Sequence, residues 1–171
     1  MRSANIIRAT VFAIAAAFLI FIQNHSVSVG TMVLHLTTAA LTLGGLVILI
    51  KQKTNRLVVA VPTVVAATVF LLSLVFSGGG TAESRLGVFT FLVAFLAGAT
   101  AIAELVFSFD AEAGDKLELR ISSAIGLVAG FFFWLAPLDD LNAVGFFSAY
   151  LSVSAVQRAL WAAAPNNRKK N

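Results

Sequence analysis

The sequence predicts an all-α membrane protein, in which six transmembrane helices form three antiparallel hairpin repeats. Apolar residues make up 59% of the chain and charged residues only 12%, against roughly 45–50% and about 25% in soluble domains. The apolar residues gather into six runs, each long enough to cross a bilayer as a helix. Apart from Arg85, every Lys and Arg falls on one side of the resulting topology.

The six runs are bounded by polar residues, glycine or proline, and they lie at about 6–22, 29–50, 57–76, 86–109, 119–136 and 141–163. A backbone in lipid must satisfy its own hydrogen bonds, and the runs lack the alternation of barrel strands, so we expect helices. The short remainder leaves no room for a soluble domain. We therefore predict a single integral membrane domain, 1–171, with hairpins at about 6–50, 57–109 and 119–163.

The first run, 6–22, has two interpretations. The basic residues up to Arg8, followed by a short apolar stretch, resemble a signal peptide. However, the polar tripeptide 23–25 stands where small residues would mark a cleavage site. The long side chain of Arg8 can also reach the interface and so lengthen the usable span. We expect an uncleaved first helix.

The second hairpin contains two residues that are unusual in a transmembrane helix. Pro62 lies in the first turns of the run 57–76, where proline costs little because first-turn N–H groups lack helical partners. Glu104 is the only acidic residue well inside an apolar run, and it lies about one turn from the end of that run. Such a charge is costly in lipid unless it is paired or close to the interface.

Small residues recur at helical spacing in the third hairpin. Ser122, Gly126 and Gly130 follow one another at intervals of four residues in the run 119–136. A face of this kind lets helix backbones approach closely in lipid. It would serve packing within the chain or, alternatively, a homo-oligomer or another membrane protein as partner.

The basic residues also set the predicted orientation. They lie at the N-terminus, between the second and third runs, between the fourth and fifth runs, and at the C-terminal end. Because basic residues favour the cytoplasmic side, we expect both termini in the cytoplasm and the protein in the plasma (inner) membrane. The hairpins are weakly similar to one another. Each has an arginine at the start of its first helix and a glycine at the start of its second: Arg8, Arg56 and Arg120, then Gly30, Gly87 and Gly145.

Two pairs of ionisable residues are candidates for function. Arg158 sits in the last run at a depth similar to that of Glu104, so the two side chains form an ion pair, reach the interface separately, or belong to a proton or ion pathway. His25 and His35 both fall on the outer half. Histidine changes charge within the physiological pH range, so they could report external acidification; alternatively, His25 is solvated and His35 bonds to a neighbour.

Signatures of other function classes are missing from the sequence. The chain has no cysteine, which excludes disulfides and thiolate metal sites. We found no zinc-protease, serine-hydrolase or P-loop motif. The pI near 10.0 reflects bases scattered over helix ends rather than a basic nucleic-acid-binding face. We expect no enzyme activity, cofactor, metal or nucleic-acid partner, and a lipid bilayer as the surroundings.

The three-hairpin pattern resembles the HdeD-type family of bacterial inner-membrane acid-resistance proteins over the whole chain. The residues that carry the resemblance are the arginine near the start of each odd helix, the segment SSAIGLVAGFFFWLAP, and the even-helix ending GATAIAELVFSF. It implies a multi-pass protein of the stress response, with no catalytic residues. A small transporter or channel for protons or a solute, and an accessory subunit of a membrane complex, remain alternatives.

Overall fold

The computed structural model describes residues 2–51, 56–76 and 79–164, and its regular structure there is entirely helical. The all-α class is therefore confirmed. The predicted basic residues Lys53, Arg168, Lys169 and Lys170 lie outside the described residues. Six helices follow one another along the chain: α1 (Arg2–Phe21), α2 (Val27–Lys51), α3 (Arg56–Phe76), α4 (Ala82–Phe109), α5 (Ala113–Leu135) and α6 (Asp140–Ala163).

Five of these helices, α1 to α5, are long and apolar enough to cross a membrane. The sixth, α6, is of similar length at 24 residues, but serines, Gln157 and Arg158 interrupt its apolar sequence. Several apolar helices in succession indicate a multi-pass membrane protein.

All six helices begin earlier than the apolar runs predict, most of all α5, which starts at Ala113 rather than at 119. Helix α1 starts at Arg2 rather than at 6, and α4 starts at Ala82 rather than at 86. The added turn of α5 carries Asp115, which suits the positive end of the helix dipole. The length of an apolar run thus indicates how much of a helix is apolar, but not where the helix begins.

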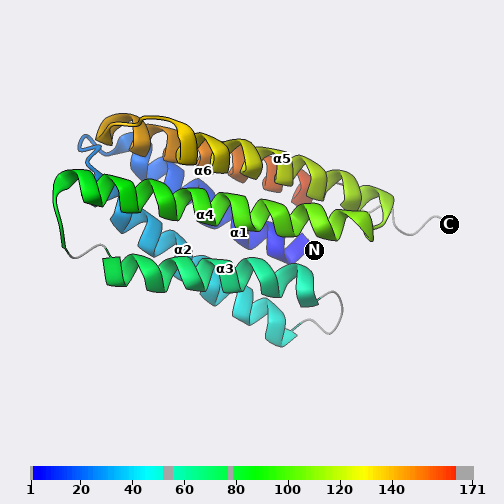
Figure 1. The fold of residues 1–171 in the computed structure, drawn as a ribbon. Helices are drawn as coiled ribbons and strands as arrows, with labels where there is room; N and C mark the ends of the chain where they lie inside the picture. Colours follow the sequence, from blue (N-terminus) through cyan, green and yellow to red (C-terminus); the bar gives the residue numbers. More distant parts are fainter. Residues whose placement is uncertain (1, 52–55, 77–78, 165–171) are drawn as a thin grey trace.

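The helices run up and down along a common direction (Figure 1). Helix α1 begins and α6 ends at one end of the bundle, which we call the terminal end (Figure 1). Helices α2 and α4 end, and α3 and α5 begin, at the same end (Figure 1). Helices α1, α3 and α5 end, and α2, α4 and α6 begin, at the opposite end (Figure 1).

Neighbouring helices pack in a closed ring, in chain order, with α6 returning to α1. The most extensive packing is between α4 and α5, between α1 and α6, and between α2 and α3. The helices of each of these pairs belong to different predicted hairpins. The two helices of a predicted hairpin therefore pack less extensively on each other than on the helices of neighbouring hairpins. Helices α2, α4 and α6 also contact one another, which places them toward the inside of the ring.

Small residues make the close α4–α5 packing possible. A Cβ atom added to Gly126 would lie 2.7 Å from the Cβ of Ala101 and 3.0 Å from the carbonyl oxygen of Ala97. One added to Gly130 would lie 3.1 Å from the Cα of Gly98. The stripe that the sequence singled out on α5 is thus used for packing within this chain.

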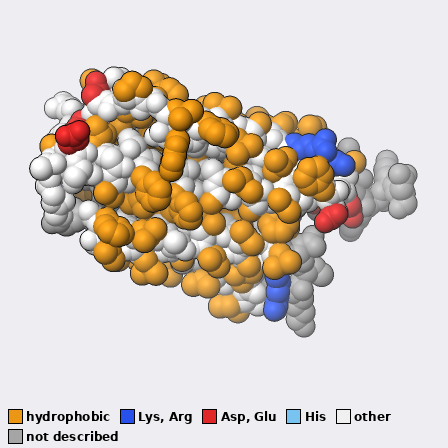
Figure 2. All heavy atoms as spheres, viewed as in Figure 1, with side chains coloured by type: hydrophobic (Ala, Val, Ile, Leu, Met, Phe, Trp, Pro, Cys, Tyr) orange, Lys and Arg blue, Asp and Glu red, His pale blue; other side chains and the backbone are white. Residues whose placement is uncertain are grey.

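The core and the surface are both apolar. The main core cluster fills the middle of the bundle and its opposite end, where the Phe89 and Phe147 rings meet edge to face with centroids 5.6 Å apart. Outside, side chains such as Phe21 and Ile50 are 85% and 82% exposed. Figure 2 shows hydrophobic side chains over the middle of one face, with Lys, Arg, Asp and Glu near its ends. Such a surface is typical of a protein whose middle faces lipid.

Candidate functional site: a buried charge cluster

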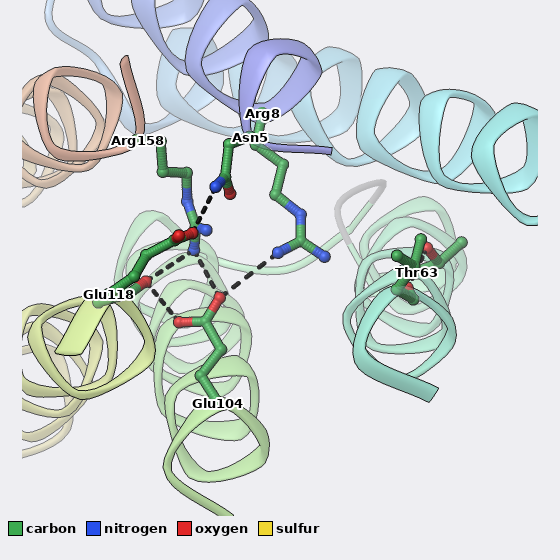
Figure 3. Close-up of polar contacts among 8 residues, drawn as sticks. Asn5, Arg8, Thr63, Glu104, Glu118 and Arg158 are labelled. Carbon is green, nitrogen blue, oxygen red and sulfur yellow. Dashed lines mark hydrogen bonds and ion pairs between the residues drawn. The ribbon is translucent and has the colours of Figure 1, made fainter. Parts of the chain in front are cut away.

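Charged and polar side chains from four helices meet inside the bundle near the terminal end. We call this group the charge cluster, and Figure 3 shows how it converges on Glu104. Helix α1 contributes two of its members, α4 one, α5 two and α6 one: Asn5, Arg8, Glu104, Glu118, Ser122 and Arg158.

Glu104 is the centre of the cluster, and its carboxylate accepts from three side chains. Arg158 donates through Nη2 to Oε1 at 2.7 Å, and Arg8 donates through Nη1 to the same oxygen at 3.4 Å. The hydroxyl of Ser122 donates to Oε2 at 2.5 Å. The same Arg158 nitrogen also donates to the Ser122 oxygen at 2.9 Å. Both oxygens of the buried carboxylate are therefore satisfied.

Glu118 forms the second half of the cluster. Its Oε1 accepts a hydrogen bond from the side-chain amide of Asn5. This contact joins α1 to α5, whereas the Arg8 contact joins α1 to α4. The cluster as a whole holds two guanidinium and two carboxylate groups, with no net charge when all four are ionised. Balance of this kind is what makes several charges tolerable in an apolar surrounding.

The cluster members are deeply buried. The side chains of Glu104, Arg158 and Arg8 are 2%, 8% and 14% exposed. The contacts join the α4–α5 pair to the α1–α6 pair, which otherwise meet through the less extensive α5–α6 and α4–α6 packing. The cluster therefore ties together the side of the ring where apolar packing is weakest.

A small cavity of about 30 Å³ lies beside the cluster. Arg8, Arg158, Tyr150 and Thr63 contribute polar atoms to its lining, together with apolar side chains from α1 to α4. A volume of this size is sufficient for one water molecule. Among the pockets described, this cavity is the only one that both arginines of the cluster line.

The structure brings Glu104 and Arg158 together as a direct ion pair. It adds Arg8, whose recurrence at the start of a hairpin we had attributed to orientation alone. It also adds Asn5 and Glu118, each of which directly precedes a predicted apolar run. The sequence feature that could have indicated these contacts is the similar depth of the residues at one end of the predicted bundle.

The two histidines lie apart from the cluster. His25 is in the connection between α1 and α2, and His35 is on α2, where its ring meets that of Phe70 edge to face with centroids 6.3 Å apart. The Nε2 atom of His35 is buried and has no hydrogen-bond partner among the described residues. His35 lines a pocket at the opposite end of the bundle, and His25 is not among the residues that line it.

The groups of the charge cluster are engaged with one another. Each carboxylate of the cluster accepts at least one hydrogen bond, and that of Glu104 accepts from the Ser122 hydroxyl as well as from the arginines. Among residues 2–51, 56–76 and 79–164, no three His, Asp or Glu side chains are close enough to hold a metal ion. Comparisons of this chain with protein-family models, curated proteins and solved structures found no match.

Proposed function

We propose that this chain is a non-enzymatic, six-span protein of the bacterial plasma membrane that supports tolerance of the envelope to acid or related stress, as the resemblance to the HdeD-type family implies. In this proposal the terminal end faces the cytoplasm, and the three hairpins are repeats. The charge cluster closes the ring of helices from the cytoplasmic side.

The six-span topology is supported by the position of α6 in the bundle. This helix packs along α1 over much of its length and also contacts α2 and α4, so it lies among helices that are apolar enough to cross the membrane. Its polar side chains are mostly turned inward, since Ser148, Ser154, Gln157 and Arg158 are all buried. A spanning helix with polar groups is expected to direct them toward the bundle interior in this way.

The observation that carries the stress-tolerance proposal is the division of polar and apolar contacts between the two ends. The buried hydrogen bonds to carboxylates converge on Glu104 and Glu118 at the terminal end, while those to Asp139 at the opposite end are exposed. Toward the opposite end the core is apolar, with buried side chains such as Leu19, Phe89 and Phe147. If the opposite end faces outward, external acid meets a core with few groups to protonate. Such a protein would remain folded while the outside is acidic.

Deletion of the gene for this chain is expected to lower survival at low external pH. Expression of the unchanged protein should restore survival, as should the Glu83→Gln variant, because Glu83 is exposed at the start of α4 and outside the cluster. The measurement is colony count after exposure to several acid regimes, with neutral medium as the reference. Survival that is unchanged by the deletion in every regime would refute the proposal.

A second candidate function, a small transporter or channel, is favoured by the cavity between Arg8 and Arg158. Ionisable residues inside a membrane bundle often mark an ion or proton path. Purified protein in liposomes would then conduct protons or a small anion, and Glu104→Gln would abolish the flux. An absence of flux, or flux that Glu104→Gln leaves unchanged, would remove this candidate.

A further inference from the structure

A second polar pocket lies at the opposite end of the bundle and is separate from the charge cluster. Its volume is about 220 Å³, and residues from α2, α3 and α4 line it. Its position near the starts of α2 and α4 puts it at the end that the proposed topology turns outward. Neither of the two functions proposed above uses this pocket.

The polar lining of this pocket consists of hydrogen-bonding and cationic groups. Ser28, Thr31 and His35 come from α2, and Arg85 comes from α4. No Asp or Glu is among the residues that line it. The buried Nε2 atom of His35 has no hydrogen-bond partner among the residues described, which leaves one polar atom available to a ligand.

One helix N-terminus adds to the positive character of the pocket. Helix α2 begins at Val27, and Val27 and Ser28 of its first turn line the pocket. The N-terminal turn of a helix carries a partial positive charge and favours anions. The arginine, the histidine and the start of α2 therefore favour the same kind of ligand, an anion.

The rest of the lining is apolar and limits the size of that anion. Phe76, Phe89, Val88 and Leu92 contribute hydrophobic surface from α3 and α4. The pocket is smaller than the roughly 300–1,000 Å³ of sites for drug-sized ligands. A compact ligand with an anionic head and a short apolar body matches both parts of the lining. Inorganic phosphate or sulfate would leave the apolar wall unused.

We propose that this pocket binds a small monocarboxylate from the medium. The guanidinium group of Arg85 pairs with the carboxylate, and the His35 imidazole donates a hydrogen bond to it through Nε2. The apolar body of the ligand packs against Phe89 and Leu92. The site goes beyond the proposed stress function and does not depend on it, because it stands on the lining of the pocket alone.

The test uses the purified full chain in nanodiscs and benzoate as the probe, with affinity measured by calorimetry. We expect saturable binding, and no binding of the uncharged analogue benzamide. Arg85→Gln should weaken binding by about tenfold or more, since a charge-assisted hydrogen bond is lost. His35→Gln should weaken binding less than Arg85→Gln does, because the glutamine amide can still donate a hydrogen bond.

The chain offers a matched control for each variant. Arg120→Gln removes an exposed arginine at the terminal end, and His25→Gln removes the histidine outside the pocket. Both should bind benzoate as the unchanged protein does. The proposal is overturned if Arg85→Gln, folded by its thermal transition, binds benzoate with unchanged affinity, or if benzamide binds equally well.

A second arm distinguishes a free acid from a membrane lipid as the source of the carboxylate. Competition by dodecanoate, a long-chain acid that partitions into lipid, is compared with competition by butyrate. We expect butyrate to displace benzoate and dodecanoate to do so no better, because the pocket holds only a short body. Displacement by dodecanoate alone would contradict the proposed small ligand.

Discussion

Glu104→Gln is expected to lower the free energy of unfolding by about 3–5 kcal/mol, because it leaves buried guanidinium groups without their counter-charge. The amide that replaces the carboxylate has nearly the same shape, so the loss comes from charge and not from a cavity. Arg158 would lose its 2.7 Å partner, and Arg8 its 3.4 Å partner. The measurement is denaturant-induced unfolding of the purified protein in mild detergent.

The matched control for this substitution is Glu83→Gln on the same helix. Glu83 is exposed in the first turn of α4, so its replacement should change stability by no more than about 0.5 kcal/mol. The double variant Glu104→Leu with Arg158→Met removes both partners of the shorter ion pair. It should be more stable than Glu104→Gln, because fewer buried charges are left unpaired. Equal stability of Glu104→Gln and Glu83→Gln would show that the cluster does not hold the helices together.

The second large effect is expected for Gly126→Ala, which should destabilise the protein by about 1–3 kcal/mol. The added methyl group would lie 2.7 Å from the Cβ of Ala101 and 3.0 Å from the carbonyl oxygen of Ala97. Backbone cannot move aside as a flexible side chain can, so α4 and α5 must separate. The same assay of unfolding in detergent measures the loss.

Gly87→Ala is the control for this second prediction. A Cβ at Gly87 would meet nothing within 4 Å, and alanine is the better helix former by about 1 kcal/mol. We therefore expect Gly87→Ala to be neutral or slightly stabilising. If Gly126→Ala were likewise stabilising, the close α4–α5 packing described above would be incorrect.

The helical fold could be predicted from the sequence because apolar runs of membrane-spanning length leave the backbone few alternatives. The boundaries were less accurate where polar residues extend a helix, as Asp115 and Glu118 do in α5. The extensive packing of α1 on α6, α2 on α3 and α4 on α5 was not predicted. That packing depends on which face of a helix turns inward, and long apolar runs leave this nearly undetermined.

Part of the charge cluster could also be predicted. Glu104 and Arg158 stood out because each interrupts an apolar run at a similar depth. Arg8 did not, because an arginine at the start of a transmembrane helix is already explained by orientation. Glu118 was assigned to a loop, so its contact with Asn5 was not considered. Pairing between residues of different helices depends on rotation about the helix axes, which one sequence does not reveal.

The measurement that tests the account most directly is the accessibility of single cysteines in intact cells. The natural chain has no cysteine, so a membrane-impermeant maleimide reports only the introduced thiol. Asp140→Cys and Gly114→Cys place it at exposed positions in the first turns of α6 and α5, and Ala164→Cys places it just after α6. We predict that Asp140→Cys is labelled from outside, and that the other two are labelled only after permeabilisation. Labelling of Asp140→Cys and Ala164→Cys from the same side would contradict the six-span topology.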